Sequence, residues 1–391
     1  MRRTLAILLL STLSITACSS NSSSSSGDSS TAAAASCAPA GGPVTLTFTS
    51  WVPDIQKVVD IWNAANPNIQ VKVQTGPNGN GGTYQNFFNQ LKAGNAPDLG
   101  QQDAGPMALF YRKDLFEKNN IKVPATWQEY ADAAVKVKAA GGSITNFSTA
   151  DINQFAGLAW QAGAHWFAND GTNWTVSLAD PATTKVAAYW QDLIDKKLVS
   201  AVPPWTDEWN NAYNESKAWT WVSAVWGANS IATGAPKTDG KWAVAPMPQW
   251  TAGDKIAGNW GGSSTAVFKG SKHPYEAAKF ALWLNTSTDA LTELNKVAQL
   301  YPATKAGATL PALSQGVEFY GGQKIYDEFA TASGEVKADF TWGPTMTQTY
   351  ADASDGFKAA VSGQGTLLKA LQDAQASTIK TLKSQSIPVK E

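Results

Sequence analysis

The sequence has few of the side chains on which metal, redox and nucleophilic sites depend. Among its 391 residues there are only two cysteines, Cys18 and Cys37, and two histidines, His165 and His273. Both cysteines precede the first predicted strand, so the folded part of the chain must be stable without a disulfide. The two histidines stand far apart in the sequence and exclude a multi-histidine zinc site. We therefore expect neither a metal nor another cofactor.

Charged residues are also scarce, at 16% of the chain. The 30 lysines and arginines nearly balance the 31 aspartates and glutamates, which leaves a net charge of −1. Such a chain has no electrostatic field that would attract a polyanion. We expect no nucleic acid among its partners.

The apolar run over residues 5–13 is too short to cross a membrane, which takes about 20 residues. It follows Arg2 and Arg3 and leads to the small residues before Cys18. A charged start, a short apolar middle and a small-residue cleavage region are typical of a secretory signal peptide. We predict that residues 1–17 are removed and that the protein works outside the cytoplasm.

The residues before Cys18, which read Ile-Thr-Ala, resemble the lipobox of bacterial lipoproteins. The resemblance implies that Cys18 is lipidated and becomes the mature N-terminus, so that its acyl chains hold the protein at the outer face of the cytoplasmic membrane. Residues 18–43 are mostly serine, alanine and glycine and predict a flexible linker. An ordinary cleaved signal with a cysteine nearby by chance is the alternative. We assign no function to Cys37.

Tryptophan is abundant, in contrast to cysteine, histidine and the charged residues. There are 17, and twelve of them fall between Trp160 and Trp260. Trp62, Trp190 and Trp283 lie on predicted helical stripes, which indicates core positions. From residue 205 to residue 226 the indoles fit no single helical face and alternate with aspartate, glutamate and asparagine. This concentration of indoles needs a reason beyond filling a core.

The folded part begins at Val44 with the pattern of a β-α-β unit. Alternating apolar residues from Val44 and again from Ile69 predict two strands, and helical spacing predicts a helix between them. Such a unit forms a parallel pair with a right-handed crossover. A second helix from Tyr84 and a third strand at Asp98 extend the pattern. We predict an open α/β sheet.

Two helix starts further along the chain are marked by capping residues. Thr126 and Glu129 have capping-box spacing at the start of a helix predicted to run to about residue 140. Asp180 precedes a proline at the first helical position. Between them, around residues 149–153, the composition becomes polar, and we place a crossing into a second domain there.

These segments, taken in order, resemble the extracellular solute-binding proteins of ABC importers, specifically the large carbohydrate-binding family often called family 1. Besides the lipobox, the matching segments are AGNAPDLGQ (residues 93–101), VPATWQEYADAAVKVKAAG (123–141), GNWGGSSTAVF (258–268), SKHPYEAAKFALWL (271–284) and LYPATKAG (300–307). They span nearly all of the mature chain.

The resemblance implies a two-lobed α/β fold of the periplasmic-binding-protein type, with a ligand cleft between the lobes and several inter-lobe crossings. By analogy, the N-terminal lobe takes residues 44–150 and 263–319, and the C-terminal lobe takes residues 151–262 and 320–391. The implied function is capture of a sugar by lobe closure and its delivery to the transmembrane subunits of an ABC permease. We expect the binding protein to be a monomer.

Sugars present apolar C–H faces and a rim of hydroxyl groups, so a sugar site needs aromatic plates beside polar groups. The resemblance places these groups at Trp51, Gln102, Asp103, Trp160, Trp226, Asn259, Trp260 and Trp342. Core packing is the alternative for each tryptophan, and a surface loop carboxylate is the alternative for Asp103. Trp260 is the strongest candidate, because its neighbours Asn259, Gly261 and Gly262 give it no helical or strand face to fill.

Two other functions fit the same sequence. A secreted glycoside hydrolase would also be rich in tryptophan and acids, and a binding protein of this fold could take an amino acid, a peptide or a metal. Arg112 is the only arginine after residue 3, whereas a carboxylate or phosphate ligand usually requires one. A neutral sugar therefore fits best, and the density of indoles favours an oligosaccharide.

Overall fold

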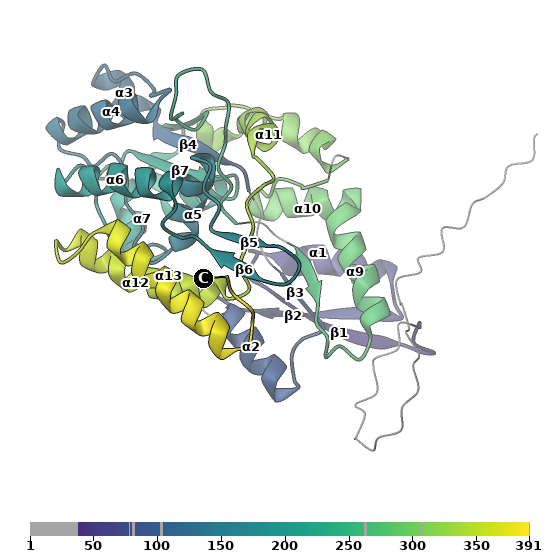
Figure 1. Ribbon diagram of the computed structural model, residues 1–391. Coiled ribbons are helices and arrows are strands. Elements are labelled where there is room, and N and C mark those ends of the chain that lie inside the picture. The colour runs from purple at the N-terminus through teal and green to yellow at the C-terminus, as the bar shows by residue number, and fades with distance from the viewer. Residues whose placement is uncertain are drawn as a thin grey trace, which may run out of the picture.

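The computed structural model describes residues 38–77, 79, 83–101, 105–261, 264–304 and 306–390, which form two lobes (Figure 1). Each lobe has its own sheet and its own cluster of buried apolar side chains. Cys18 and Cys37 lie outside the described residues. Within the described part of the chain, no helix is long and apolar enough to span a membrane.

The first lobe is built on a sheet of strand order β2-β1-β3-β9. β1 pairs in parallel with both β2 and β3, whereas β9 is antiparallel to β3. The predicted β-α-β unit and third strand are thus confirmed. The elements of this lobe are β1 (Val44–Ser50), α1 (Ile55–Ala65), β2 (Ile69–Thr75), α2 (Tyr84–Ala93), β3 (Leu99–Gln101), β9 (Thr265–Val267), α9 (Pro274–Thr286) and α10 (Thr288–Ala298).

Aromatic side chains join the sheet of the first lobe to its helices. Phe280 on α9 lies 5.4 Å from Phe48 on β1 and 5.5 Å from Trp62 on α1, measured between ring centroids. Trp62 also donates its indole N–H to the carbonyl oxygen of Ile69 at 2.8 Å. Trp62 is buried, as the helical spacing predicts.

The second lobe holds an antiparallel sheet of strand order β7-β4-β8 and a separate hairpin, β5-β6. Its strands are β4 (Met107–Arg112), β5 (Phe167–Asn169), β6 (Trp174–Val176), β7 (Thr220–Ala224) and β8 (Trp242–Ala245). Its α-helices are α3 (Lys113–Lys118), α4 (Trp127–Ala139), α5 (Ile152–Gln161), α6 (Pro181–Asp195), α7 (Asp207–Asn214), α8 (Gly227–Gly234), α11 (Ile325–Glu335), α12 (Met346–Val361) and α13 (Leu367–Ser384). Short 3₁₀ turns are η2 (Pro236–Thr238), η3 (Gly307–Thr309), η4 (Pro311–Ser314) and η5 (Glu318–Tyr320).

The capping residues read from the sequence begin their helices as predicted. The hydroxyl oxygen of Thr126 accepts from the backbone N–H of Glu129 at the start of α4. The carboxylate of Asp180 accepts from Thr183 N–H at 2.7 Å at the start of α6. At the C-terminal end of the chain, α12 and α13 pack side by side (Figure 1).

The lobe boundaries differ from the expected ones. Residues 107–150, which the family analogy assigns to the N-terminal lobe, belong to the core of the second lobe because β4 pairs with β7 and β8. Leu310 and Leu313 are also buried in that core, although residues up to 319 were expected in the first lobe. The polar composition at residues 149–153 marks the entry to α5 within one lobe rather than a crossing between lobes.

Two of the crossings between the lobes run side by side and are hydrogen-bonded to each other. Met107 N–H donates to the carbonyl oxygen of Gly258 at 2.9 Å, and Trp260 N–H donates to that of Gly105 at 3.0 Å. Beyond them, β3 and β9 continue the same antiparallel arrangement into the first lobe. This hydrogen-bonded pair of crossings, residues 105–107 with 258–260, fixes where Trp260 lies.

Helix α5 packs directly against this pair of crossings because glycines face each other at the contact. A Cβ atom at Gly157 on α5 would lie 2.6 Å from the sulfur of Met107 and 2.8 Å from the carbonyl oxygen of Asn259. A Cβ atom at Gly258 would collide with the carbonyl oxygen of Gly157. The absence of side chains at these two positions lets α5 bring its N-terminal residues next to Trp260.

The variant Gly258→Ala tests this close approach. We expect it to lower the free energy of unfolding by about 2 kcal/mol, because the added methyl group meets backbone atoms that must shift. Gly334→Ala in the last turn of α11 is the matched control, since a Cβ atom there meets nothing within 4 Å. The control should be neutral or stabilising by up to about 1 kcal/mol. Urea unfolding measures both, and equal stabilities for the two variants would contradict the packing described.

Candidate functional site

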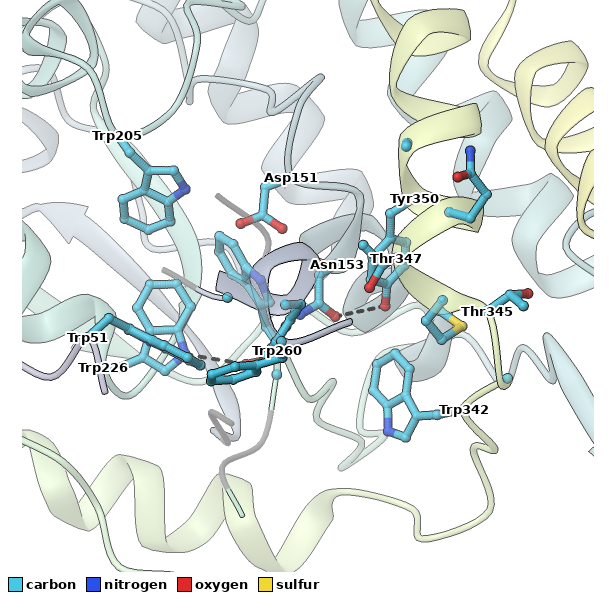
Figure 2. Close-up of a pocket in the computed structure, with 18 of the residues that line it drawn as sticks. Trp51, Asp151, Asn153, Trp205, Trp226, Trp260, Trp342, Thr345, Thr347 and Tyr350 are labelled. Carbon is cyan, nitrogen blue, oxygen red and sulfur yellow. Dashed lines mark hydrogen bonds between the residues drawn. The ribbon is translucent and has the colours of Figure 1, made fainter. Parts of the chain in front are cut away.

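A cleft of about 1260 Å³ lies between the two lobes (Figure 2). Its first-lobe wall includes Trp51, Val52, Pro53, Tyr84, Phe87, Leu91, Phe268, Ala298 and Leu300. Its second-lobe wall includes Asp151, Asn153, Trp205, Trp226, Asn229, Ser230, Trp260, Trp342, Thr345, Met346, Thr347, Gln348, Tyr350, Thr381 and Gln385. The helices α5, α8 and α12 all begin at this wall.

Several indoles of the second-lobe wall pack against one another. The rings of Trp226 and Trp260 lie 4.7 Å apart at 73°, and the indole N–H of Trp226 donates to the carbonyl oxygen of Trp260 at 3.3 Å. Behind them, the buried Trp221 lies edge-on to Trp260, with 5.6 Å between the ring centroids. We call Trp205, Trp209, Trp221, Trp226 and Trp260 the tryptophan cluster. Across the cleft, Trp51 of the first lobe lies 5.7 Å from Tyr84.

Trp205 is the most exposed member of the tryptophan cluster. Its side chain is 41% exposed, and its backbone has φ = 65°, a left-handed conformation that costs most residues about 1–2 kcal/mol. Contacts with Trp209 at 5.5 Å and Trp226 at 5.7 Å hold the ring in place. Strained residues of this kind concentrate at functional sites, which makes Trp205 a candidate contact for a ligand.

Asp151 is the charged residue in the described part of the cleft wall. It occupies the N-cap position of α5, but its side chain makes no capping hydrogen bond. One oxygen, Oδ1, is covered and has no hydrogen-bond partner, whereas the residue as a whole keeps an exposed part on the cleft. Burial raises the pKa of Asp151 to about 6, against the opposite effect of the Asn153 backbone and of the Trp205 and Trp260 side chains.

A second polar group lies beside Asp151. The phenol of Tyr350 on α12 donates to the amide oxygen of Asn153 at 3.0 Å (Figure 2). Burial raises the pKa of Tyr350 well above its usual value, so the phenol stays protonated and acts as the donor. Because the Asn153 oxygen is occupied, its amide NH₂ is the part that can donate to a ligand. The wall therefore offers a carboxylate acceptor and an amide donor close together.

The predicted site residues lie in different surroundings. Trp51, Trp226, Trp260 and Trp342 line the cleft, and their contact with a ligand stays a prediction. Gln102 and Asp103 lie outside the described residues. Although Trp260 lines the cleft, only 3% of its surface is exposed, so it also fills a core position.

Trp160 and Asn259 are not in the cleft wall. Trp160 is buried, donates its indole N–H to the carbonyl oxygen of Lys337 at 2.7 Å and stacks on Phe340 at 4.8 Å. Phe340 in turn lies 4.9 Å from Trp342, so Trp160 supports the lining residue from behind. The Asn259 amide donates to the carbonyl oxygen of Gly261 and thereby shapes the crossing segment.

Sequence reasoning missed several lining residues, namely Tyr84, Asp151, Asn153, Trp205 and Tyr350. Tyr84 and Tyr350 occupy helix positions that look like ordinary buried-face residues. Asp151 precedes a helix and looks like a normal N-cap. Trp205 carried a usable signal, because it begins the stretch in which indoles leave the helical pattern.

The single arginine of the folded chain is not available to a ligand. Arg112 is 2% exposed and forms a bidentate pair with Asp114, with N–O distances of 2.8 and 2.7 Å, and it also donates to Ser216 at 2.7 Å. Nor does the described part of the chain contain three His, Cys, Asp or Glu side chains gathered as metal ligands.

A smaller cavity of about 390 Å³ lies in the second lobe beside Tyr111, Trp242 and Gln323. The side-chain amide of Gln323 is used structurally, because it donates to the carbonyl oxygen of Val244 at 2.7 Å and accepts from Val244 N–H at 2.9 Å. This amide therefore completes the edge of β8 and does not point to a ligand.

The chain is similar to known binding proteins. A family model of the bacterial extracellular solute-binding proteins matches residues 99–291. A lactose-binding protein of Rhizobium radiobacter is 26% identical over 290 residues, which cover 71% of this chain and 67% of that protein. None of these matches is to an enzyme.

Solved structures of two bifidobacterial proteins share the fold. The galacto-N-biose/lacto-N-biose I-binding protein of an ABC transporter from Bifidobacterium longum, in complex with lacto-N-biose, is 26% identical with a TM-score of 0.78, over 90% of this chain and 100% of that one. An ABC-transporter-associated binding protein from B. animalis subsp. lactis Bl-04, in complex with β-1,6-galactobiose, is 23% identical with a TM-score of 0.80. The match covers 89% of this chain and 99% of that one. The two-lobed fold is thus confirmed.

Substitution of Trp260 and Trp342 separates core from lining positions. We expect Trp260→Ala to lower the free energy of unfolding by about 3–5 kcal/mol, because it empties a buried site in the tryptophan cluster. Trp342→Ala should cost only about 1 kcal/mol, because its ring is 37% exposed. Denaturant unfolding of both variants checks this, and a larger loss for Trp342→Ala would contradict the burial described.

Proposed function

The chain belongs to the bacterial extracellular solute-binding proteins, and we propose that it is the sugar-binding component of an ABC importer. It captures a neutral saccharide in the cleft between its lobes and presents it to the transmembrane subunits of the permease. The similar proteins named for lactose and for galacto-N-biose and lacto-N-biose support this ligand class.

The observation that carries the proposal is the combination of indoles with the carboxylate of Asp151, whose Oδ1 atom is covered and has no hydrogen-bond partner. The indoles that line the cleft suit the apolar C–H faces of a sugar ring; they are Trp51, Trp205, Trp226, Trp260 and Trp342. The carboxylate accepts and the Asn153 amide donates hydrogen bonds, as neighbouring sugar hydroxyl groups require. The wrong sugar would leave these groups unpaired, which is a strong source of specificity.

The size of the cleft supports an oligosaccharide. Its volume of about 1260 Å³ is above the roughly 300–1,000 Å³ of ordinary small-molecule sites. Aromatic groups lie in two places, with the tryptophan cluster in one and Trp342 beside the start of α12 in the other. Two such platforms suit a ligand with at least two sugar units.

Closure of the lobes follows from where the groups lie. The first lobe contributes Trp51 and Tyr84 to the cleft, whereas the second lobe contributes Asp151 and three members of the tryptophan cluster, namely Trp205, Trp226 and Trp260. A ligand that contacts both walls favours the closed state, and the paired crossings at residues 105–107 and 258–260 are suited to act as the hinge.

Two alternatives are less well supported. A retaining glycoside hydrolase needs two carboxylates about 5 Å apart, whereas Asp151 is the one carboxylate lining the described part of the cleft. A phosphorylated or carboxylated ligand would need a cation, and no Lys, Arg or His lines that same part. We therefore propose binding without catalysis and a neutral ligand.

Calorimetry tests the proposal. The chain from residue 42 onward is titrated with lactose, lacto-N-biose and β-1,6-galactobiose, with amino acids as controls. At least one saccharide should bind saturably and be recovered intact by chromatography. Trp342→Ala should weaken that binding about tenfold, which corresponds to about 1.4 kcal/mol of lost stacking.

The matched control is Trp283→Phe, which changes a partly buried indole on α9 away from the cleft. Its affinity should stay within about twofold of the unsubstituted protein. Recovery of a cleaved sugar would replace the proposal with hydrolysis. Binding of an amino acid but of no saccharide would overturn the ligand class.

The lipid anchor is tested separately. Full-length protein expressed in a bacterium should partition with the membrane, because acyl chains on Cys18 each contribute about 0.8 kcal/mol per buried CH₂. Cys18→Ala should move the protein to the soluble exported fraction or leave its signal uncleaved, whereas Cys37→Ala should not. Membrane association of the Cys18→Ala protein after signal removal would refute lipidation at this position.

A further inference from the structure

Asp151 has an unusual role for a residue at the start of a helix. Its backbone N–H donates to the hydroxyl of Ser148 at 2.9 Å, but its carboxylate does not cap α5. By contrast, Thr126, Asp180, Thr206 and Thr366 cap their helices with their side chains. The carboxylate is instead turned into the cleft wall, near Trp205 and Trp260 (Figure 2).

The surroundings of this carboxylate contain no compensating cation among the described lining residues. Hydrogen bonding from the Asn153 and Gln154 backbone on α5, and from the Trp205 and Trp260 side chains, favours the ionised carboxylate, but burial outweighs it. The titratable group that faces it from α12 is Tyr350, which burial keeps protonated. Both histidines, His165 and His273, lie outside the cleft lining.

These surroundings make the charge state of Asp151 sensitive to mild acid. Burial disfavours the charged carboxylate and raises its pKa to about 6, so a large share of the protein carries a neutral carboxyl group just below that pH. A sugar hydroxyl group reverses this preference, because it donates a charge-assisted hydrogen bond to the ionised form only. The ligand and the proton thus compete for the same group.

We propose that Asp151 holds the saccharide in its ionised form, so that binding expels a proton from the cleft and weakens in mildly acidic solution. This inference rests on the proposed function, since it assumes a ligand with hydroxyl groups. It makes Asp151 a specificity-determining residue and links sugar capture to the pH outside the cell.

The sign and size of the effect follow from proton linkage. Above the pKa of the ligand-free protein, Asp151 is already ionised and affinity does not depend on its protonation. Below it, each bound saccharide must displace a proton, so affinity falls by up to about tenfold per pH unit. Between pH 7.5 and pH 5 the dissociation constant should therefore rise about tenfold.

The experiment measures affinity by calorimetry at pH 7.5, 6 and 5, with whichever of lactose, lacto-N-biose and β-1,6-galactobiose binds the protein. At pH 6, titrations in two buffers of different ionisation enthalpy should reveal release of about half a proton per ligand. Asp151→Asn should bind more weakly at pH 7.5 and lose most of the pH dependence, because an amide does not titrate in this range.

Two control variants identify the titrating group. Asp254→Asn removes an exposed loop carboxylate, and His165→Gln removes the exposed histidine that lies 3.9 Å from Asp339. Both should keep the full pH dependence. If Asp151→Asn does not fold, the absence of proton release on ligand binding by the unsubstituted protein or by His165→Gln would still overturn the proton linkage.

The outcomes separate this inference from the proposed function. Equal affinity at pH 5 and 7.5, or a pH dependence that persists in Asp151→Asn or disappears in His165→Gln, would overturn the proton linkage while sugar binding stands. Binding of no saccharide at any of the three pH values would overturn the proposed function, and the inference with it.

Discussion

The structure depends on one backbone contact, the pairing of two chain segments that cross between the lobes with α5 packed against them. The hydrogen bonds between Met107 and Gly258 and between Trp260 and Gly105 hold these crossings together. The missing side chains of Gly157 and Gly258 then let α5 approach to backbone distance. In consequence, Trp260 from a crossing and Asp151 from the helix start meet in the same part of the cleft wall.

A carboxylate buried among indoles lowers the stability of the folded protein unless hydrogen bonds or a ligand compensate for the lost hydration. Most buried polar groups are paired, and an unpaired one calls for an explanation. Partial burial of Asp151 in the cleft wall strengthens any hydrogen bond that a ligand makes to it. The same burial raises its pKa, so capture of the ligand and sensitivity to acid have one physical cause. Sugar binding and proton linkage are therefore two consequences of one arrangement.

Much of the fold can be predicted from the sequence, because strand alternation and helix capping depend on residues that are close together along the chain. Alternating apolar residues on either side of α1 predict the parallel pair of strands β1 and β2. The capping residues Thr126 and Asp180 predict the starts of α4 and α6. The lobe boundary does not follow from them, because the partners of β4 lie more than 100 residues away along the chain. Nor does the sequence reveal that Asp151 leaves its helix uncapped, since that depends on the rings that surround it.

The most direct test of this account is a crystal structure of the protein with a bound neutral oligosaccharide. We expect a sugar ring between Trp51 and the tryptophan cluster, with a hydroxyl group donating to Asp151 and the lobes closed around it. A sugar bound elsewhere, for example in the smaller cavity beside Trp242, or a ligand in the cleft that leaves Asp151 unpaired, would contradict it.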